Sequence, residues 1–332
     1  MTSSLEQFVA RVLTDGESPR DVAAELRRGA DAALARAAAA HLEPVGWLDE
    51  RYPARLRRIP DPPAVLWVGG DAGSLRSSRT VAVVGSRAAS PYGLSVARQL
   101  GHDLALAGVV VVSGLARGCD GAAHRGALDA GGRTVAVVGC GADVVYPREH
   151  RALRGEVAAA GAIVSELPPG APPLPVHFPL RNRIISGLTA AVVIVEASAR
   201  SGSLITASCA LEQGREVMAV PGNVLSERHT GCHELLRDGA CLVQSARDVL
   251  DGLGWGAGAP AGGPRGPATP AAPGPDGPGL LACLTPGEEL DVDTLAARTG
   301  LEPADLLAEL TRLEIAGVLE RVAGGRFVRP GR

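Results

Sequence analysis

The stretch TVAVVGSRAAS at residues 80–90 decides the fold. An apolar run of strand length passes there into a glycine-bearing turn, and a predicted helix follows over residues 92–107. Similar runs occur at residues 109–114, 134–139, 162–166, 191–197 and 216–222, mostly separated by predicted helices. Because these runs are apolar without alternation, they indicate strands buried on both faces. Strands that alternate with helices predict an α/β fold with a parallel sheet.

The segment before this core has a different pattern. Residues 5–42 carry Ala, Leu and Arg at helical spacing, and the run at residues 64–68 predicts a short strand. We therefore expect a small N-terminal helical domain at residues 1–75. The extended Rossmann-like parallel sheet would then form a core at residues 76–253.

Two further segments follow the core. Residues 254–279 are dominated by Gly, Pro and Ala, a composition typical of a flexible linker. Residues 280–332 predict a helix, a turn at Gly300, a second helix and two short strands that turn at Gly324 and Gly325. This order is typical of a winged-helix domain.

The composition restricts the chemistry. All 33 basic residues are Arg, because the 332-residue sequence contains no Lys, and the net charge is −3. Mechanisms that need a Walker A lysine or a Schiff-base lysine are excluded. A global basic field is also absent, so a bound polyanion would meet local Arg side chains and backbone N–H groups.

Cysteine spacing and hydropathy point to a protein without metal, cofactor or membrane span. The six Cys include no C-x-x-C pair, so we expect reduced, inert thiols. The glycine turn after residue 84 is not G-x-G-x-x-G, and no paired catalytic carboxylates are evident. The first residues, MTSSLEQF, lack the apolar segment of a signal peptide, and every apolar run is of strand length. We expect a cytoplasmic protein.

Four strand-end loops are candidate anion sites, since ligands of open α/β sheets bind at the carboxyl ends of the strands. Glycine permits close approach of the backbone, hydroxyls and N–H groups donate, and Arg offers a fork to phosphate. Phe178 adds a surface on which a base could stack. The candidates are Gly85, Ser86 and Arg87; Ser113, Gly114, Arg117 and Gly118; Phe178, Arg181, Asn182 and Arg183; and Ser201, Gly202, Ser203 and Thr206.

Each loop also has a purely structural interpretation. The glycine loops could be ordinary turns, Phe178 could be a core residue, and the serines could be helix caps. Arg181 and Arg183 cannot share one helix face, so one could enter a site while the other packs. Asp120 and His124 could form an acid/base pair, but a helix-capping role for Asp120 is favoured because no nucleophile motif accompanies them.

The winged-helix domain is the obvious candidate for reading DNA. Its would-be recognition helix, residues 303–317, carries Asp305, Glu309 and Glu314 against Arg312 alone. Phosphates repel such a helix, so we expect a protein-contact or regulatory module instead.

Taken together, these motifs resemble the DprA/Smf family of DNA-processing proteins. The resemblance runs in order from about residue 52 to residue 250. It is carried by YPARLRRIPDPPAVLWVGG (52–70), VAVVGSR (81–87), VVSGLARGCDGAAH (111–124), TVAVVGCGADVVYP (134–147), IVSELPPG (163–170), FPLRNRIISGL (178–188), VEASARSGSLITA (195–207), GREVMAVPG (214–222) and GCHELLRDGA (231–240).

The resemblance implies an extended Rossmann fold that binds single-stranded DNA, protects it and loads the RecA recombinase onto it. It also implies a homodimer and a role in the uptake of transforming DNA. The strand-end candidates above carry over as DNA contacts. Residues 1–47 lack the helix-hairpin-helix-like segment of many relatives, which puts DNA binding by the N-terminal helices in doubt.

Two other functions compete with a non-catalytic binder. Related Rossmann-like phosphoribohydrolases cleave nucleoside monophosphates with a glycine loop and a Glu, and Glu196 precedes the loop at residues 199–203 here. A transcriptional regulator could use the winged helix, although its acidic helix argues against that.

Overall fold

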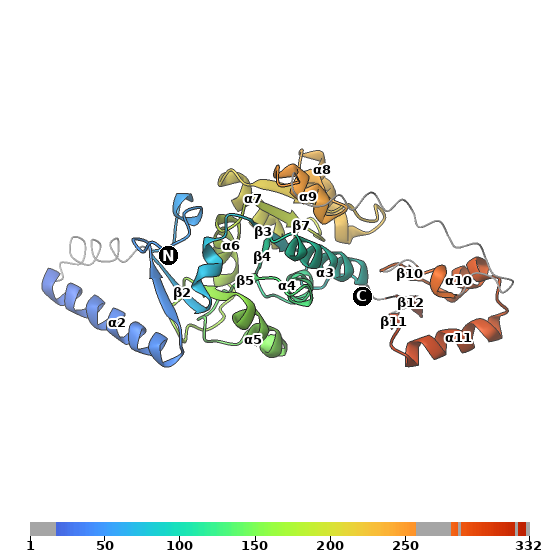
Figure 1. Ribbon diagram of the computed structural model, residues 1–332, viewed down its shortest axis with the longest axis horizontal. Coiled ribbons are helices and arrows are strands. Elements are labelled where there is room, and N and C mark those ends of the chain that lie inside the picture. Colours follow the sequence, from blue (N-terminus) through green and yellow to red (C-terminus); the bar gives the residue numbers. More distant parts are fainter. Residues whose placement is uncertain (1–17, 257–279, 285–286, 323–324, 330–332) are drawn as a thin grey trace.

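The computed structural model describes residues 18–256, 280–284, 287–322 and 325–329. Its centre is one nine-stranded sheet in the order β1-β2-β6-β5-β4-β3-β7-β8-β9 (Figure 1). The strands are β1 (Glu43–Gly46), β2 (Val65–Gly70), β3 (Thr80–Val84), β4 (Val110–Ser113), β5 (Thr134–Val137), β6 (Ala162–Ser165), β7 (Ala191–Ile194), β8 (Glu216–Ala219) and β9 (Cys241–Leu242).

Strands β3 to β9 are parallel, which confirms the predicted α/β class. The four central strands β3, β4, β5 and β7 are fully buried, as expected for unbroken apolar runs covered on both faces. The structure adds what the sequence did not predict: β1 and β2 extend this same sheet in antiparallel pairing, with Trp67 opposite Ser165 on β6. The N-terminal segment therefore contributes strands to the core sheet.

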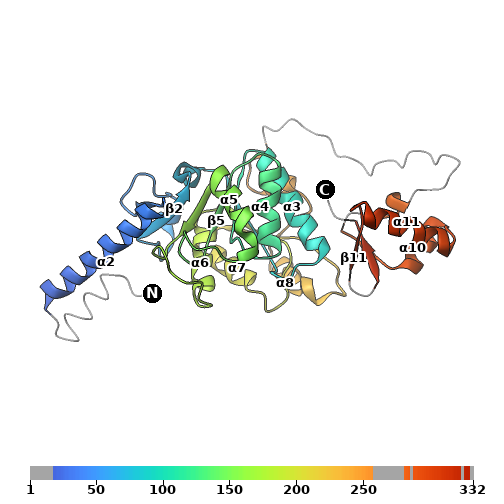
Figure 2. The same ribbon diagram turned by 90° about the horizontal axis from the view of Figure 1, so that it is seen from below.

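Helices cover both faces of the sheet (Figure 2). One face packs against α2 (Pro19–Ala39), α3 (Pro91–Leu106), α4 (Cys119–Asp129), α5 (Arg151–Ala160) and α9 (Ala246–Gly252). The other face packs against α6 (His177–Gly187), α7 (Ser203–Glu212), α8 (Thr230–Arg237) and the short 3-10 helix η1 (Leu56–Arg58). The remaining 3-10 turns are η2 (Ala72–Arg76), η3 (Arg148–His150) and η4 (Glu227–His229).

The C-terminal unit has its own apolar core of leucines and Phe327. It contains η5 (Leu280–Ala282), α10 (Val292–Thr299), α11 (Pro303–Ile315) and a sheet of β10 (Glu289–Leu290), β12 (Arg326–Val328) and β11 (Glu320–Val322). Gly300 ends α10 in the left-handed conformation at φ 68°, which is why glycine serves at that turn. The winged-helix prediction is confirmed. Most of the expected linker, and Gly324 of the expected wing turn, lie outside the described residues.

Within the described ranges, no helix combines the length and the apolar character that crossing a bilayer requires.

Candidate nucleic-acid interface

The predicted strand-end loops gather around one groove at the carboxyl edge of the sheet. We call it the strand-end groove; it has a volume of about 550 Å³. It is lined by loops that follow β3 and β7 and by the first turns of α6 and α7. Of the predicted residues, it contains Gly85, Ser86, Arg87, Phe178, Arg181, Asn182, Ser201, Gly202, Ser203 and Thr206.

A narrower pocket adjoins this groove and contains Gly114 and Arg117 from the β4–α4 loop. Arg87, Phe178 and Arg181 line both hollows, so the two are continuous. Strand order explains the convergence, because β3 lies between β4 and β7 in the sheet.

Three predicted residues line neither hollow. The Ser113 hydroxyl donates to the Val83 carbonyl at 2.7 Å and is buried. Gly118 has a φ of 73°, and a Cβ there would lie 2.2 Å from the Ser86 carbonyl oxygen. Its role is to let the β3 and β4 loops touch. Arg183 turns away to the other side of α6, where it pairs with two carboxylates.

Arg87 is the available cation of the groove. It is exposed, and no described carboxylate pairs with it. Its guanidinium carbon instead lies 5.1 Å from the centre of the Phe178 ring, within the range of a cation–π contact. This contact holds the charge at the mouth of the groove and leaves its N–H groups free for an anion.

Tyr146 completes an aromatic pair that the sequence interpretation missed. Its ring centre lies 5.3 Å from that of Phe178, tilted by 40°, and its side chain is 41% exposed. Tyr146 lines both hollows. The signal was present, because Tyr146 is one of only three tyrosines and follows β5 in the loop at that same sheet edge.

Arg181 is used inside the protein. It is buried, and its guanidinium donates to the carbonyls of Gly114 and Val137. Burial lowers its pKa to about 10, although the nearby Asp120 favours the charged form. Asp120 in turn accepts from the backbone N–H of Gly114 at 3.1 Å. Arg181 thus shapes the groove floor by anchoring the Gly114 loop.

Arg117 is also paired. It forms an ion pair with Glu149 on η3, and its side chain is 66% exposed. An exposed pair of this kind is held weakly, so a phosphate could compete for Arg117.

The start of α7 contributes two hydroxyls. The residue at the N-cap position is Gly202, which has no side chain to cap the helix, and the Ser201 hydroxyl accepts from the Ser203 N–H at a long 3.5 Å. The Ser201 and Ser203 hydroxyls lie 2.8 Å apart at this end, and the Asn182 amide reaches the Gly202 carbonyl at 3.4 Å. Donors from α6 and α7 therefore meet where the helix N-terminus favours negative charge.

The alternative catalytic residues occupy different surroundings. His124 is fully buried, and its Nδ1 lies 2.7 Å from the Thr134 hydroxyl, which itself donates to the Val111 carbonyl. Burial lowers the pKa of His124 to about 3, so the ring is neutral. No hydrogen bond joins it to Asp120 in the described structure. The Asp120 carboxylate lies inside the first turn of α4 and braces the β4 loop, rather than capping the helix.

Glu196 is likewise enclosed. Its buried carboxylate accepts from the backbone and the hydroxyl of Ser90 and lies 3.9 Å from Arg228. It does not line the strand-end groove. Among the described residues, no group of three or more His, Cys, Asp or Glu side chains is arranged to hold a metal ion.

The fold and its appended domain define a Rossmann-type α/β protein that carries a C-terminal winged helix. The sequence matches the family described as DNA recombination-mediator protein A over residues 44–254, and the DprA winged helix domain over residues 264–325. The chain belongs to this DprA/Smf family, as its motifs predicted.

Individual relatives agree. Protein Smf of Escherichia coli is 43% identical over 295 residues, covering 87% of this chain and 77% of the relative. The DNA processing protein DprA of Streptococcus pneumoniae is 46% identical over 61% of this chain and 71% of its own length. A solved structure of DprA from that organism matches with a TM-score of 0.60 at 43% identity, over 63% of this chain and 74% of that one.

A solved structure from Helicobacter pylori is also similar to this chain. It describes the single-stranded DNA binding mode of DNA processing protein A. It matches with a TM-score of 0.58 at 29% identity, covering 64% of this chain and 97% of that chain.

Proposed function

We propose that this chain binds single-stranded DNA in the strand-end groove without regard to base sequence. The observation that carries the proposal is the pairing of Arg87 with Phe178 at the groove mouth. An unpaired guanidinium can receive a phosphate, and the adjacent Phe178 and Tyr146 rings can stack on a base. Stacking accepts every base, since each has a π-face, so the site needs no base-edge reader.

The groove suits a strand better than a duplex. The Arg87 guanidinium contacts the Phe178 ring, and that ring contacts Tyr146. A ligand that uses this site must therefore bring a phosphate and a neighbouring base to it at the same time. In a duplex the bases are paired and stacked on one another, so their edges are accessible in the grooves but their faces are not available to an aromatic ring. Membership of the DprA/Smf family, and the ligand named for the Helicobacter pylori relative, support the same choice.

The family resemblance extends the proposal to a pathway. The chain would protect incoming single strands in the cytoplasm, act as a homodimer and load RecA onto the bound strand during natural transformation. Loading is tested by following RecA filament growth on strands precoated by a single-strand-binding protein, with and without this chain.

The phosphoribohydrolase-like alternative is not favoured, because the Glu196 carboxylate is occupied by Ser90 and does not reach the groove. Release of free base from a nucleoside monophosphate, abolished by Glu196→Gln, would establish that alternative.

The binding proposal is tested by a salt titration of fluorescently labelled oligothymidylate, oligodeoxyadenylate and a duplex of equal length. We expect the two single strands to bind alike and the duplex to bind more weakly. The log–log slope against salt should be about −0.7 per phosphate neutralised on a single strand. Equal affinity for duplex, or affinity that is insensitive to salt, contradicts the proposal.

A further inference from the structure

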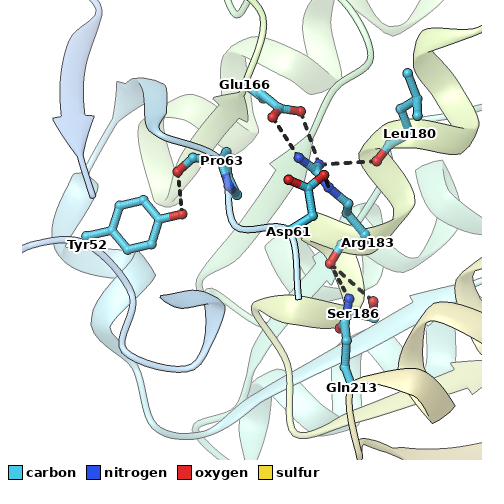
Figure 3. Close-up of polar contacts among 8 residues, drawn as sticks. All are labelled: Tyr52, Asp61, Pro63, Glu166, Leu180, Arg183, Ser186 and Gln213. Carbon is cyan, nitrogen blue, oxygen red and sulfur yellow. Dashed lines mark hydrogen bonds and ion pairs between the residues drawn. The ribbon is translucent and has the colours of Figure 1, made fainter. Parts of the chain in front are cut away.

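Arg183 lies at the centre of an ion-pair triad (Figure 3). Its Nη2 and Nη1 reach the two carboxylate oxygens of Glu166 at 2.7 and 3.1 Å, and its Nε reaches Asp61 at 3.0 Å. Every nitrogen of the guanidinium therefore has a carboxylate partner. The side chains of Arg183 and Glu166 are only 16% and 23% exposed, so water screens this pair less than it would on an open surface, whereas the Asp61 carboxylate is 78% exposed.

The triad joins three parts of the chain that are far apart in sequence. Arg183 belongs to α6, Glu166 follows β6, and Asp61 lies in the N-terminal segment 122 positions earlier than Arg183. The contact with Glu166 is bidentate, a geometry that fixes orientation as well as distance. The triad thus sets where α6 sits relative to the sheet edge.

The loop that carries Asp61 is itself held in place. The Tyr52 hydroxyl donates to the Pro63 carbonyl at 2.7 Å, and this contact is buried (Figure 3). The C-terminal end of α6 also packs closely against η1, because a Cβ on Gly187 would lie 2.6 Å from the side chain of Leu56. A further contact to α6 comes from Gln213 at the end of α7, whose side-chain amide donates to the Arg183 carbonyl at 3.0 Å.

This arrangement leaves Arg183 poorly placed to hold phosphate. A phosphate would have to displace a bidentate carboxylate and would face the negative charges of Glu166 and Asp61. Arg183 also lines neither the groove nor its adjoining pocket. On the same helix, however, Phe178, Arg181 and Asn182 line the groove directly.

We propose that Arg183 is a positioning residue: with Glu166 and Asp61 it braces α6, so that Phe178 and Asn182 are presented to the bound strand while the buried Arg181 keeps its place in the groove floor. The idea rests on the proposed function of the groove. It reverses the expectation that Arg183 contacts DNA itself. It also gives the N-terminal segment a part in DNA binding that does not require that segment to touch DNA.

The brace and a direct phosphate contact predict opposite signs for one substitution. Glu166→Gln removes a negative charge and releases part of the Arg183 guanidinium. If Arg183 held phosphate, the freed cation would bind single-stranded DNA more tightly. If Arg183 is a brace, the weakened pair lets α6 shift, and affinity falls about threefold. Glu156→Gln is the matched control, because Glu156 pairs with Arg125 between α5 and α4, outside the groove.

Arg183→Ala separates the two roles by salt dependence. As a brace, its loss weakens oligothymidylate binding about tenfold and leaves the log–log slope against salt unchanged. A slope smaller by about 0.7 would show that a phosphate contact had been lost, and would overturn the proposal. So would tighter binding by Glu166→Gln, judged relative to Glu156→Gln. If Arg183→Ala does not fold, Glu166→Gln and Asp61→Asn decide the question by the sign of their effect.

Amide hydrogen exchange measured without DNA tests the brace independently of the proposed function. The brace predicts faster amide exchange in α6 (His177–Gly187) of Arg183→Ala, with α3 unchanged. Unchanged exchange in α6 contradicts the brace. If α6 loosens but the wild-type protein does not bind single strands, the proposed function fails while the brace itself stands.

Discussion

The strand-end groove and the winged-helix unit are the two regions that could meet nucleic acid, and their principal candidate arginines, Arg87 and Arg312, are held differently, although Arg321 of the winged unit also lies over an aromatic ring, 5.9 Å from the centre of Phe327. In the groove, Arg87 lies exposed against an aromatic ring with no carboxylate partner among the described residues. In the winged unit, Arg312 pairs with Glu309 on the same helix at 2.6 Å. Arg298 pairs with Glu288, and Arg326 pairs with Glu289.

The difference leads us to expect that the winged unit does not read DNA, although it has the shape of a DNA-binding motif. Helix α11 has the position of a recognition helix, yet it carries Asp305, Glu309 and Glu314. A phosphate approaching Arg312 would have to displace Glu309 and approach the other two acids. The groove lacks any such motif, but it combines a guanidinium without a described carboxylate partner, two tilted aromatic rings in contact and a helix N-terminus.

Replacing one arginine in each region by alanine should give the largest difference in single-strand affinity between the two regions. Arg87→Ala should weaken single-strand binding about 30-fold, because a charge-assisted phosphate contact is lost. The salt slope should also become shallower by about 0.7. Fluorescence anisotropy over a range of salt concentrations measures both quantities.

Arg312→Ala is the matched control and should leave affinity within about twofold, since its guanidinium is already neutralised by Glu309. If Arg312→Ala lowers the affinity for single-stranded DNA as much as Arg87→Ala does, the winged unit contacts the strand and the expected difference between the two regions is wrong.

Phe178→Leu tests how much base stacking contributes to the affinity for single-stranded DNA. Leucine keeps the apolar bulk but removes the ring, so affinity should fall about tenfold for oligothymidylate and oligodeoxyadenylate alike. The salt slope should change little, because Arg87 keeps its charge even though it loses the ring against which it lies. A loss confined to one of the two sequences would point to base recognition in place of stacking.

The two regions should also differ in acid sensitivity. Residues 280–332 contain no histidine, whereas the core buries His124 with its pKa lowered to about 3 from 6.5. The unfolded state takes up a proton below pH 6.5 and the folded state does not. The stability of the core should therefore fall as pH drops from 6.5 towards 3, by about 1.4 kcal/mol per pH unit.

Urea unfolding of wild type and His124→Gln at pH 7 and pH 5.5 measures this effect. The difference in free energy of unfolding between the two pH values should shrink in the variant. An equal pH dependence in both proteins would show that His124 is not the group responsible.

Local patterns were sufficient to predict the core strands and the winged unit. Strand β3 was expected over residues 80–85 and is observed at Thr80–Val84, because an unbroken apolar run has few alternatives to burial. The strand near residues 64–68 was also expected, but its place in the sheet was not. It pairs with β1 on one side and with β6 on the other, and the choice of β6 depends on a pairing between distant segments that no local pattern encodes.

The candidate site shows the same limit at the level of single side chains. Spacing alone predicted that Arg181 and Arg183 diverge from α6. It could not show that Arg181 anchors the Gly114 loop, or that Arg183 meets Asp61, since both partners come from other elements. Arg87 was identified from its own loop at the end of β3, but its contact with Phe178 depends on α6 and was not predicted.

The antiparallel attachment of β2 bears on the order in which a nascent chain can complete its fold. Val65–Gly70 leaves the ribosome long before Ala162–Ser165, to which it pairs. Until then this strand has an open edge, and unpaired edges recruit other chains. The acidic and arginine-rich residues around it, such as Arg57, Arg58 and Asp61, are the kind of charged flanks that keep such an edge soluble during synthesis.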